Sequence, residues 1–201
     1  GFPAHNGDCH IKFGHIAGDS IFVVKIATGF YDNPAKGLPT TSGMMIALSA
    51  ETGAVVAILR DEGWLTDLRT ALAGAIATRA GMRADARRIG IVGAGTQARF
   101  QIRAAAHLLR EREPLFAVWG RSPEKLEALR RDLAGEGIAV EPVVELEALC
   151  AQSDALITVT PAAAPIIRDD WIRPGTHITA LGADAPGKQE LDTALVADRK
   201  S

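Results

Sequence analysis

The sequence predicts an α/β protein in which a doubly wound parallel sheet follows part of a β-rich domain. Apolar runs rich in β-branched residues dominate residues 20–60. After residue 88, strand-like runs alternate with helix-like segments, as in parallel sheets covered by helices on both faces. A glycine-rich turn joins the first strand and helix of this alternating part. We expect two domains, residues 1–85 and residues 86–201.

The first domain has strand-like and helical patterns of its own. Residues 20–30 (SIFVVKIATGF) read as a strand, and residues 43–60 read as a hairpin with residues 51–53 (ETG) at its turn. A helix is expected next, with Thr66 as its N-cap. Its apolar positions follow near-helical spacing: Leu65, Leu68, Leu72 and Ile76.

The second domain alternates strands and helices. Ser122 is expected to cap one helix, with Pro123 at its first position, and an Ala- and Leu-rich helix is expected over residues 96–109. The five expected strands cover residues 88–92, 115–119, 138–140, 154–159 and 177–181.

Composition excludes several classes of partner. The net charge of −2 gives no electrostatic reason to expect nucleic acid, and no apolar run reaches the roughly 18 residues that would suggest a membrane span. No signal peptide is visible, and two distant cysteines favour free thiols in the cytoplasm. The chain lacks an initiating Met and ends where a helix is expected to begin, so we expect truncation at both ends.

The glycine-rich turn reads IGIVGAGTQA over residues 89–98 and holds a G-x-G-x-x-A pattern. Gly93 allows a tight turn, Gly95 lets the backbone approach a pyrophosphate, and Ala98 lets the helix pack against the sheet. The helix N-terminus offers N–H groups and partial positive charge to phosphates. The alternative is a sharp turn without a ligand, but the strand–helix–strand context favours a Rossmann-type dinucleotide site.

The end of the second strand of this domain bears on the choice of dinucleotide. NAD-binding proteins usually have Asp or Glu there, whereas this chain has Trp119 and Gly120 followed by Arg121 and Ser122. Arg121 suits a ribose 2′-phosphate, so NADP is favoured over NAD. The alternative is that Arg121 is a solvated loop residue.

Two cations are candidates for binding an anion. Lys25 interrupts an apolar strand, so it lies either at the rim of the sheet or towards a site. Arg69 falls in the first turn expected of its helix, where a cation is misplaced unless an anion lies nearby. The alternative for Arg69 is a surface salt bridge with Asp67 or Asp61.

Two further residues follow strands of the parallel sheet. Asp184 comes just after the fifth strand, where an acid is placed to move a proton at a reacting carbon or nitrogen. The alternative is an Asx turn before Pro186. Thr160 ends the fourth strand and either lines a nicotinamide pocket or forms a plain turn. The five histidines show no metal-ligand spacing, so no metal site is expected.

Four segments together resemble the ornithine cyclodeaminase/mu-crystallin family. They are residues 25–40 (KIATGFYDNPAKGLPT), 65–71 (LTDLRTA), the GAGTQA loop and 175–192 (GTHITALGADAPGKQELD). The resemblance covers nearly all of the chain. It implies a Rossmann domain joined to a β-rich domain that binds substrate and forms a homodimer.

The resemblance also implies roles for individual residues. Lys25 and Arg69 match the pair that holds a substrate carboxylate, and Asp184 matches the acid that assists proton transfer. Thr70 lies near the cofactor, and Arg121 is similar to NADP-preferring members. The pyrophosphate loop matches at Gly93, Gly95, Thr96 and Gln97.

One position departs from the family pattern. The cyclodeaminase has a glutamate on the strand before Lys25, whereas this chain has His10, Ile11 and Lys12. Lys12 repels a cationic side chain, which disfavours ornithine. The implied activity is hydride transfer at the Cα–N bond of an amino acid or its imine, as a cyclodeaminase-type lyase or an imine reductase. The alternative is a non-catalytic, crystallin-like dinucleotide-binding protein.

Overall fold

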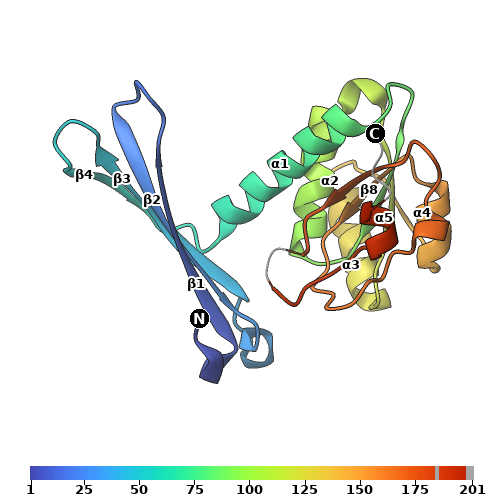
Figure 1. Ribbon diagram of the computed structural model, residues 1–201, viewed down its shortest axis with the longest axis horizontal. Helices are drawn as coiled ribbons and strands as arrows, with labels where there is room; N and C mark the ends of the chain where they lie inside the picture. The colour runs from blue at the N-terminus through green and yellow to red at the C-terminus, as the bar shows by residue number, and fades with distance from the viewer. Residues whose placement is uncertain (184–185, 198–201) are drawn as a thin grey trace. The chain divides into compact units, whose positions relative to one another are not determined.

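The computed structural model describes residues 1–183 and 186–197, and the chain divides into two compact units, residues 1–68 and 69–201 (Figure 1). Helix α1 (Trp64–Gly81) begins in the first unit and continues through the second. Most of this helix therefore belongs with the second unit, although the sequence pattern grouped it with residues 1–85.

The first unit is a four-stranded antiparallel sheet with the order β1-β2-β3-β4. The predicted strand over residues 20–30 and the predicted hairpin are confirmed, and Gly53 takes a φ of 72° at the hairpin turn. The strand before them contains Lys12 and spans nine residues. The four strands are β1 (Gly7–His15), β2 (Ile21–Phe30), β3 (Thr41–Ser49) and β4 (Val55–Leu59).

The prediction that Thr66 caps helix α1 is wrong, because the helix begins at Trp64. Glu62 and Gly63 have φ values of 51° and 94°, and this turn brings the Asp61 carboxylate to the Leu65 N–H, with 2.7 Å between Oδ2 and N. Asp61 thus supplies the acceptor expected from Thr66. Arg69 then lies beyond the first helical turn, where a cation is no longer electrostatically unfavourable. Its position in the helix therefore does not indicate a nearby anion.

The second unit has a five-stranded parallel sheet with the order β7-β6-β5-β8-β9. All five predicted strands are present, although the strand expected over residues 138–140 lies two residues later. They are β5 (Arg88–Val92), β6 (Leu115–Trp119), β7 (Val140–Pro142), β8 (Ala155–Thr158) and β9 (His177–Ala180). The chain goes from β5 to β6 and β7 on one side, then crosses to β8 and β9 on the other. Ligands bind at such a switch point.

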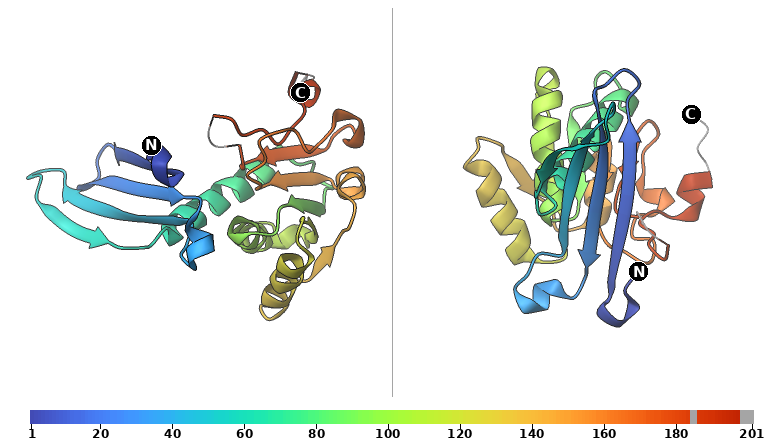
Figure 2. Two further views of the ribbon diagram at one scale, coloured as in Figure 1. Left: turned by 90° about the horizontal axis from the view of Figure 1, so that it is seen from below. Right: turned by 90° about the vertical axis from the view of Figure 1, so that its left-hand side faces the viewer.

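Helices cover both faces of this sheet (Figures 1 and 2). Helix α1 packs on one face with α2 (Thr96–Leu108) and α3 (Pro123–Ala134). The other face carries α4 (Leu146–Gln152) with the short helices η4 (Asp169–Trp171) and α5 (Thr193–Ala197). This arrangement confirms the predicted Rossmann-type α/β fold. The other short 3₁₀ helices are η1 (Pro3–His5), η2 (Asn33–Lys36) and η3 (Arg110–Arg112).

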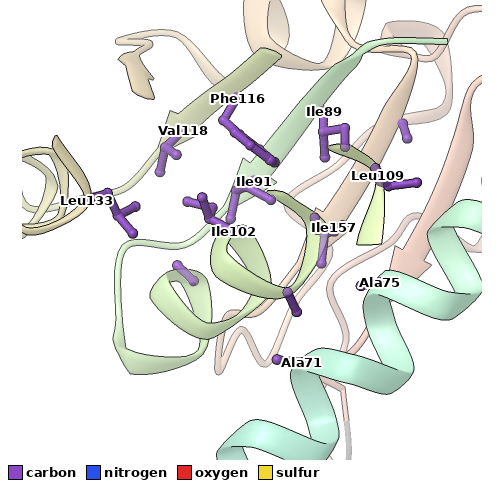
Figure 3. Close-up of a cluster of buried hydrophobic side chains, with 14 of the residues drawn as sticks. Ala71, Ala75, Ile89, Ile91, Ile102, Leu109, Phe116, Val118, Leu133 and Ile157 are labelled. Carbon is purple, nitrogen blue, oxygen red and sulfur yellow. The ribbon is translucent and has the colours of Figure 1, made fainter. Parts of the chain in front are cut away.

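The larger core of the second unit lies beneath α1, α2 and α3 (Figure 3). Ile89 and Ile91 of β5 belong to this cluster, with Ile91 beside Ile102 of α2, whereas Val92 belongs to the cluster on the opposite face. Alternation along β5 therefore anchors the strand on both sides, up to the point where the glycine-rich turn begins. Among the described residues, no helix is both long and apolar enough to cross a membrane.

Candidate functional site

The glycine-rich turn between β5 and α2 has the geometry that the sequence predicts. Gly93 has a φ of 125°, and its N–H donates to the Trp119 carbonyl oxygen at 2.8 Å. A Cβ at Gly93 would lie 3.0 Å from the Val159 carbonyl oxygen. Ala98 is fully buried, as close packing of α2 on the sheet requires. Gly93 is therefore required by the fold itself.

Gly95 differs from Gly93 because the fold alone does not require a glycine there. It is the N-cap residue of α2, with an ordinary φ of −87° and no side-chain cap on the helix. A Cβ at Gly95 would have no heavy atom within 4 Å apart from its chain neighbours. The missing side chain therefore leaves open space at a helix N-terminus, which suits a pyrophosphate.

Arg99 braces this turn and was not singled out from the sequence. Its guanidinium donates to the carbonyl oxygens of Ala94 and Gly95, each at 3.3 Å, and forms an ion pair with Asp132 at 2.9 Å. These contacts hold two carbonyl groups of the turn at the α2 side. No short sequence pattern marks Arg99, because its partners are main-chain atoms and a residue of α3.

Thr70, Gln97 and Gln101 connect α1 with the start of α2. The Gln101 amide donates to the Thr70 carbonyl oxygen at 3.2 Å and to Gln97 Oε1 at 3.5 Å. Gln101 is completely buried, and its Oε1 has no hydrogen-bond partner among the described residues. Two predicted cofactor residues, Thr70 and Gln97, are thus joined through Gln101, which was not predicted. Thr96 is exposed at the first position of α2.

The end of β6 lies against the glycine-rich turn. A Cβ at Gly120 would lie 2.7 Å from the Ala94 Cβ, so this close approach requires glycine. Arg121 follows and is exposed. Ser122 caps α3 as predicted, accepting the Lys125 N–H at 3.2 Å, and its hydroxyl donates to Glu124 at 2.8 Å. This hydrogen bond lowers the pKa of Glu124, so an ionised carboxylate lies against the Ser122 hydroxyl.

Thr160 lies beyond the end of β8, and its polar groups point to a buried carboxylate. Its N–H and its hydroxyl both donate to Glu190 Oε1, each at 2.7 Å. The hydroxyl also accepts the Ala162 N–H at 3.4 Å. Thr160 thus helps to fix the loop after β8. Glu190 was not among the predicted site residues.

Lys25 lies in the middle of β2, which has neighbouring strands on both sides, so the interpretation that placed it at the sheet rim is wrong. It is half-buried, and its register partners are Lys12 on β1 and Met45 on β3. Residues paired in this way project from the same face of a sheet. Two lysines side by side repel each other, and a bound anion would offset that repulsion.

The remaining predicted residues are less defined. Arg69 is exposed on α1 in the second unit, whereas Lys25 belongs to the first unit. Asp184 lies outside the described residues. Among the residues that the structure does describe, no group of three or more His, Cys, Asp or Glu side chains is arranged to hold a metal ion.

The strand order of the second unit, the glycine-rich turn at its switch point and the open helix N-terminus define a Rossmann-type dinucleotide-binding domain. The chain belongs to the ornithine cyclodeaminase/mu-crystallin family, whose sequence model matches residues 2–200. The family resemblance noted in the sequence is thereby confirmed.

Similar proteins include enzymes with a bound nicotinamide dinucleotide. A Rhizobium meliloti protein, provisionally named a dehydrogenase, is 42% identical over 97% of this chain and 59% of its own length. The structure of Thermococcus litoralis Delta(1)-pyrroline-2-carboxylate reductase with NADH and L-proline has a TM-score of 0.79 and 27% identity, covering 97% of this chain and 64% of that chain.

An archaeal alanine dehydrogenase dimer with bound NAD has a TM-score of 0.82 and 28% identity, covering 98% of this chain and 63% of that chain. This chain therefore spans less than two thirds of the length of all three of these relatives.

Proposed function

We propose that this chain is the core of an NAD(P)-dependent enzyme that transfers a hydride at the Cα–N bond of an amino acid or its imine. The open space at Gly95 carries the proposal, because a glycine that the fold does not require stands where a pyrophosphate needs close approach. The solved relatives that bind NADH or NAD support it. The nicotinamide supplies or accepts the hydride, and the protein orients the substrate and handles protons.

Substrate binding is assigned to two cations. Lys25 and Arg69 are proposed to bind the substrate carboxylate, since ammonium and guanidinium groups are the natural partners of that group. The position of Lys12 beside Lys25 disfavours a cationic substrate side chain and favours a neutral or anionic one. Asp184 is proposed to exchange a proton with the substrate nitrogen.

A homodimer is the proposed assembly, with residues 1–85 contributing to substrate binding and dimerisation. The β1–β4 sheet has a row of large apolar side chains at matched register positions, running from Phe13 through Val24 and Ile46 to Ile58. Phe13 is 83% exposed and Ile58 is 61% exposed. Exposed apolar rows of this kind mark interaction surfaces. The dimeric archaeal relative supports the assignment.

Turnover is tested by following NADPH and NADH oxidation by the full-length protein, with small cyclic imines or with 2-oxo acids plus amines. We expect steady oxidation that depends on the imine or on both the oxo acid and the amine. Cyclodeamination would instead release ammonia from a diamino acid with no net change in the dinucleotide. Binding of dinucleotide without either reaction would contradict the enzymatic proposal and favour the crystallin-like alternative.

We propose NADP as the preferred dinucleotide, on the ground that Arg121 replaces the usual acid after β6. The protein is expected to bind NADPH more tightly than NADH, and Arg121→Asp is expected to invert that order. An aspartate would repel the 2′-phosphate and accept a hydrogen bond from a free 2′-hydroxyl. A 2′-phosphate that accepted a hydrogen bond from the Ser122 hydroxyl would also have to displace the Glu124 carboxylate from that hydroxyl. Equilibrium titration of both dinucleotides gives the two affinities.

The matched control is Arg131→Asp, which introduces the same charge change at an exposed arginine of α3. It should leave the ratio of the two affinities unchanged. Equal affinities for NADPH and NADH that do not respond to Arg121→Asp would show that Arg121 does not select the dinucleotide.

A further inference from the structure

Glu190 is a buried carboxylate at the carboxyl edge of the parallel sheet. The residue is 1% exposed, and its side-chain carboxylate accepts four hydrogen bonds. Oε1 accepts the Thr160 N–H and hydroxyl, each at 2.7 Å, and Oε2 accepts the Thr158 hydroxyl at 2.6 Å and the Gly182 N–H at 2.8 Å. All four of these donors are neutral groups.

These contacts tie together the loops that follow two adjacent strands. Thr158 ends β8, Thr160 follows it, and Gly182 comes two residues after the end of β9. A Cβ at Gly182 would collide with both the Thr160 carbonyl oxygen and the Glu190 carboxylate. Glycine at this position therefore lets the two loops close over Glu190.

The tied loops lie next to the glycine-rich turn. The Val159 N–H donates to the Val92 carbonyl oxygen at 2.9 Å, and Val159 is the neighbour that a Cβ at Gly93 would meet. The strand order gives the direction of a bound dinucleotide. A dinucleotide with its pyrophosphate at the end of β5 and its adenosine ribose towards β6 would place its nicotinamide half over β8 and β9.

The main chain around Glu190 is anchored independently of its carboxylate. The Glu190 carbonyl oxygen accepts the N–H groups of Ile166 and Ile167 at 2.9 Å and 3.1 Å. The Asp192 N–H donates to the Ile167 carbonyl oxygen at 2.9 Å. Burying a carboxylate is costly, and an apolar side chain would fill this space more cheaply. The function of the carboxylate is therefore to hold the two loops together, and not to anchor its own main chain.

We propose that Glu190 is a positioning residue that fixes the loops after β8 and β9 against the nicotinamide half of the dinucleotide. The inference rests on the proposed dinucleotide function. In this proposal Glu190 determines the shape of the protein surface next to the nicotinamide, whereas the glycine-rich turn binds the pyrophosphate. Gly182 also precedes Asp184 by two residues, so the same carboxylate fixes the start of the segment that carries the proposed acid.

The test is Glu190→Gln in the full-length protein. Each carboxylate oxygen accepts a main-chain N–H, so either orientation of the amide turns its NH₂ group towards a donor that cannot accept. One loop is then released. ADP-ribose has the pyrophosphate and both riboses but no nicotinamide ring, so it reports binding of the dinucleotide without any contact to the ring. If the protein binds NADPH more tightly than NADH, the probe is the 2′-phosphate of ADP-ribose instead of ADP-ribose.

Glu190→Gln is expected to weaken binding of the reduced dinucleotide by about tenfold, and of ADP-ribose by less than about threefold. The turnover number should fall as well. Thr158→Val removes one hydroxyl but keeps both main-chain contacts, so it should show the same selectivity with a smaller loss. Glu141→Gln, at a half-exposed carboxylate of β7, is the matched control and should change neither affinity.

Equal weakening of both ligands by Glu190→Gln or by Thr158→Val would mean general damage and would overturn the positioning role. Unchanged affinities and turnover would overturn it as well. Failure of the wild-type protein to bind any dinucleotide would overturn the proposed function, and this inference with it. Selective loss of the reduced dinucleotide, with ADP-ribose binding retained, supports both.

Discussion

Gly95→Ala is expected to weaken dinucleotide binding by about 100-fold while leaving the fold nearly as stable as in the wild-type protein. The backbone at Gly95 has a φ of −87°, which alanine adopts without strain, and the new methyl group meets no heavy atom within 4 Å apart from its chain neighbours. The methyl group instead occupies space that a pyrophosphate needs. One such overlap costs about 1–3 kcal/mol, and the loss of close N–H contacts adds to it.

The measurement combines equilibrium titration with thermal unfolding. Wild-type protein at a ligand concentration of 100 times Kd should gain about 2.7 kcal/mol of unfolding free energy, and Gly95→Ala should gain only about 0.4 kcal/mol at that same concentration. Without ligand, the two melting temperatures should agree closely, because alanine in place of an N-cap glycine costs about 1 kcal/mol at most. Wild-type affinity in Gly95→Ala would contradict close approach of the pyrophosphate to Gly95.

Gly93→Ala provides the contrasting variant within the same turn. Its φ of 125° is unfavourable for alanine, and the Cβ would lie 3.0 Å from a carbonyl oxygen and 3.1 Å from Cγ2 of Val159. This variant should therefore lose about 1–3 kcal/mol of unfolding free energy even without ligand. A loss of binding without a loss of stability is therefore expected for Gly95→Ala but not for Gly93→Ala, although both glycines belong to one sequence motif.

Much of the second unit could be predicted from the sequence because its three central strands, β5, β6 and β8, are mostly buried apolar runs and its turns use glycine for local reasons. Residues 88–92 are apolar throughout after Arg88, and the G-x-G-x-x-A pattern meets steric requirements that depend on few other residues. The short helix α4 was missed because only Leu149 and Cys150 of its seven residues are buried. Two buried positions do not define a helical period.

The start of α1 illustrates a different reason for error. Thr66 has the chemistry of an N-cap, but the chain turns at Glu62 and Gly63 through positive φ values and makes Asp61 the acceptor instead. The choice between two suitable acceptors depends on the turn, which apolar spacing does not reveal.

The site was only partly predictable because some of its residues act through distant partners. Glu190 contacts residues 8 to 32 positions away, and Arg99 pairs with Asp132, 33 positions away. These pairings arise from the folded sheet and its helices. By contrast, Gly95 and Ser122 act within a few residues of themselves, so their roles were visible in the sequence.

Asp184→Asn is expected to lower the turnover number by about 10²- to 10⁴-fold, with dinucleotide affinity close to that of the wild-type protein. Proton transfer by a placed acid contributes a rate factor of about this size, and asparagine keeps the shape of the side chain but cannot exchange the proton. The proposed pyrophosphate site lies in the turn after β5 and should not respond. Rapid-mixing measurement of hydride transfer, together with dinucleotide titration, separates the two effects.

Arg69→Ala and Lys25→Ala are expected to act differently from Asp184→Asn, raising KM for the substrate far more than they lower kcat. Removing one charged partner of a carboxylate costs about 1.5–3 kcal/mol, or about 10- to 150-fold in KM. The controls are Arg79→Ala, at an exposed arginine of the same helix as Arg69, and Asp170→Asn, at an exposed aspartate. Both should leave kcat and KM unchanged. Near-normal kcat in Asp184→Asn would show that Asp184 does not transfer the proton and would favour its alternative role as a turn residue before Pro186. Unchanged KM in both Arg69→Ala and Lys25→Ala would show that the substrate carboxylate binds elsewhere.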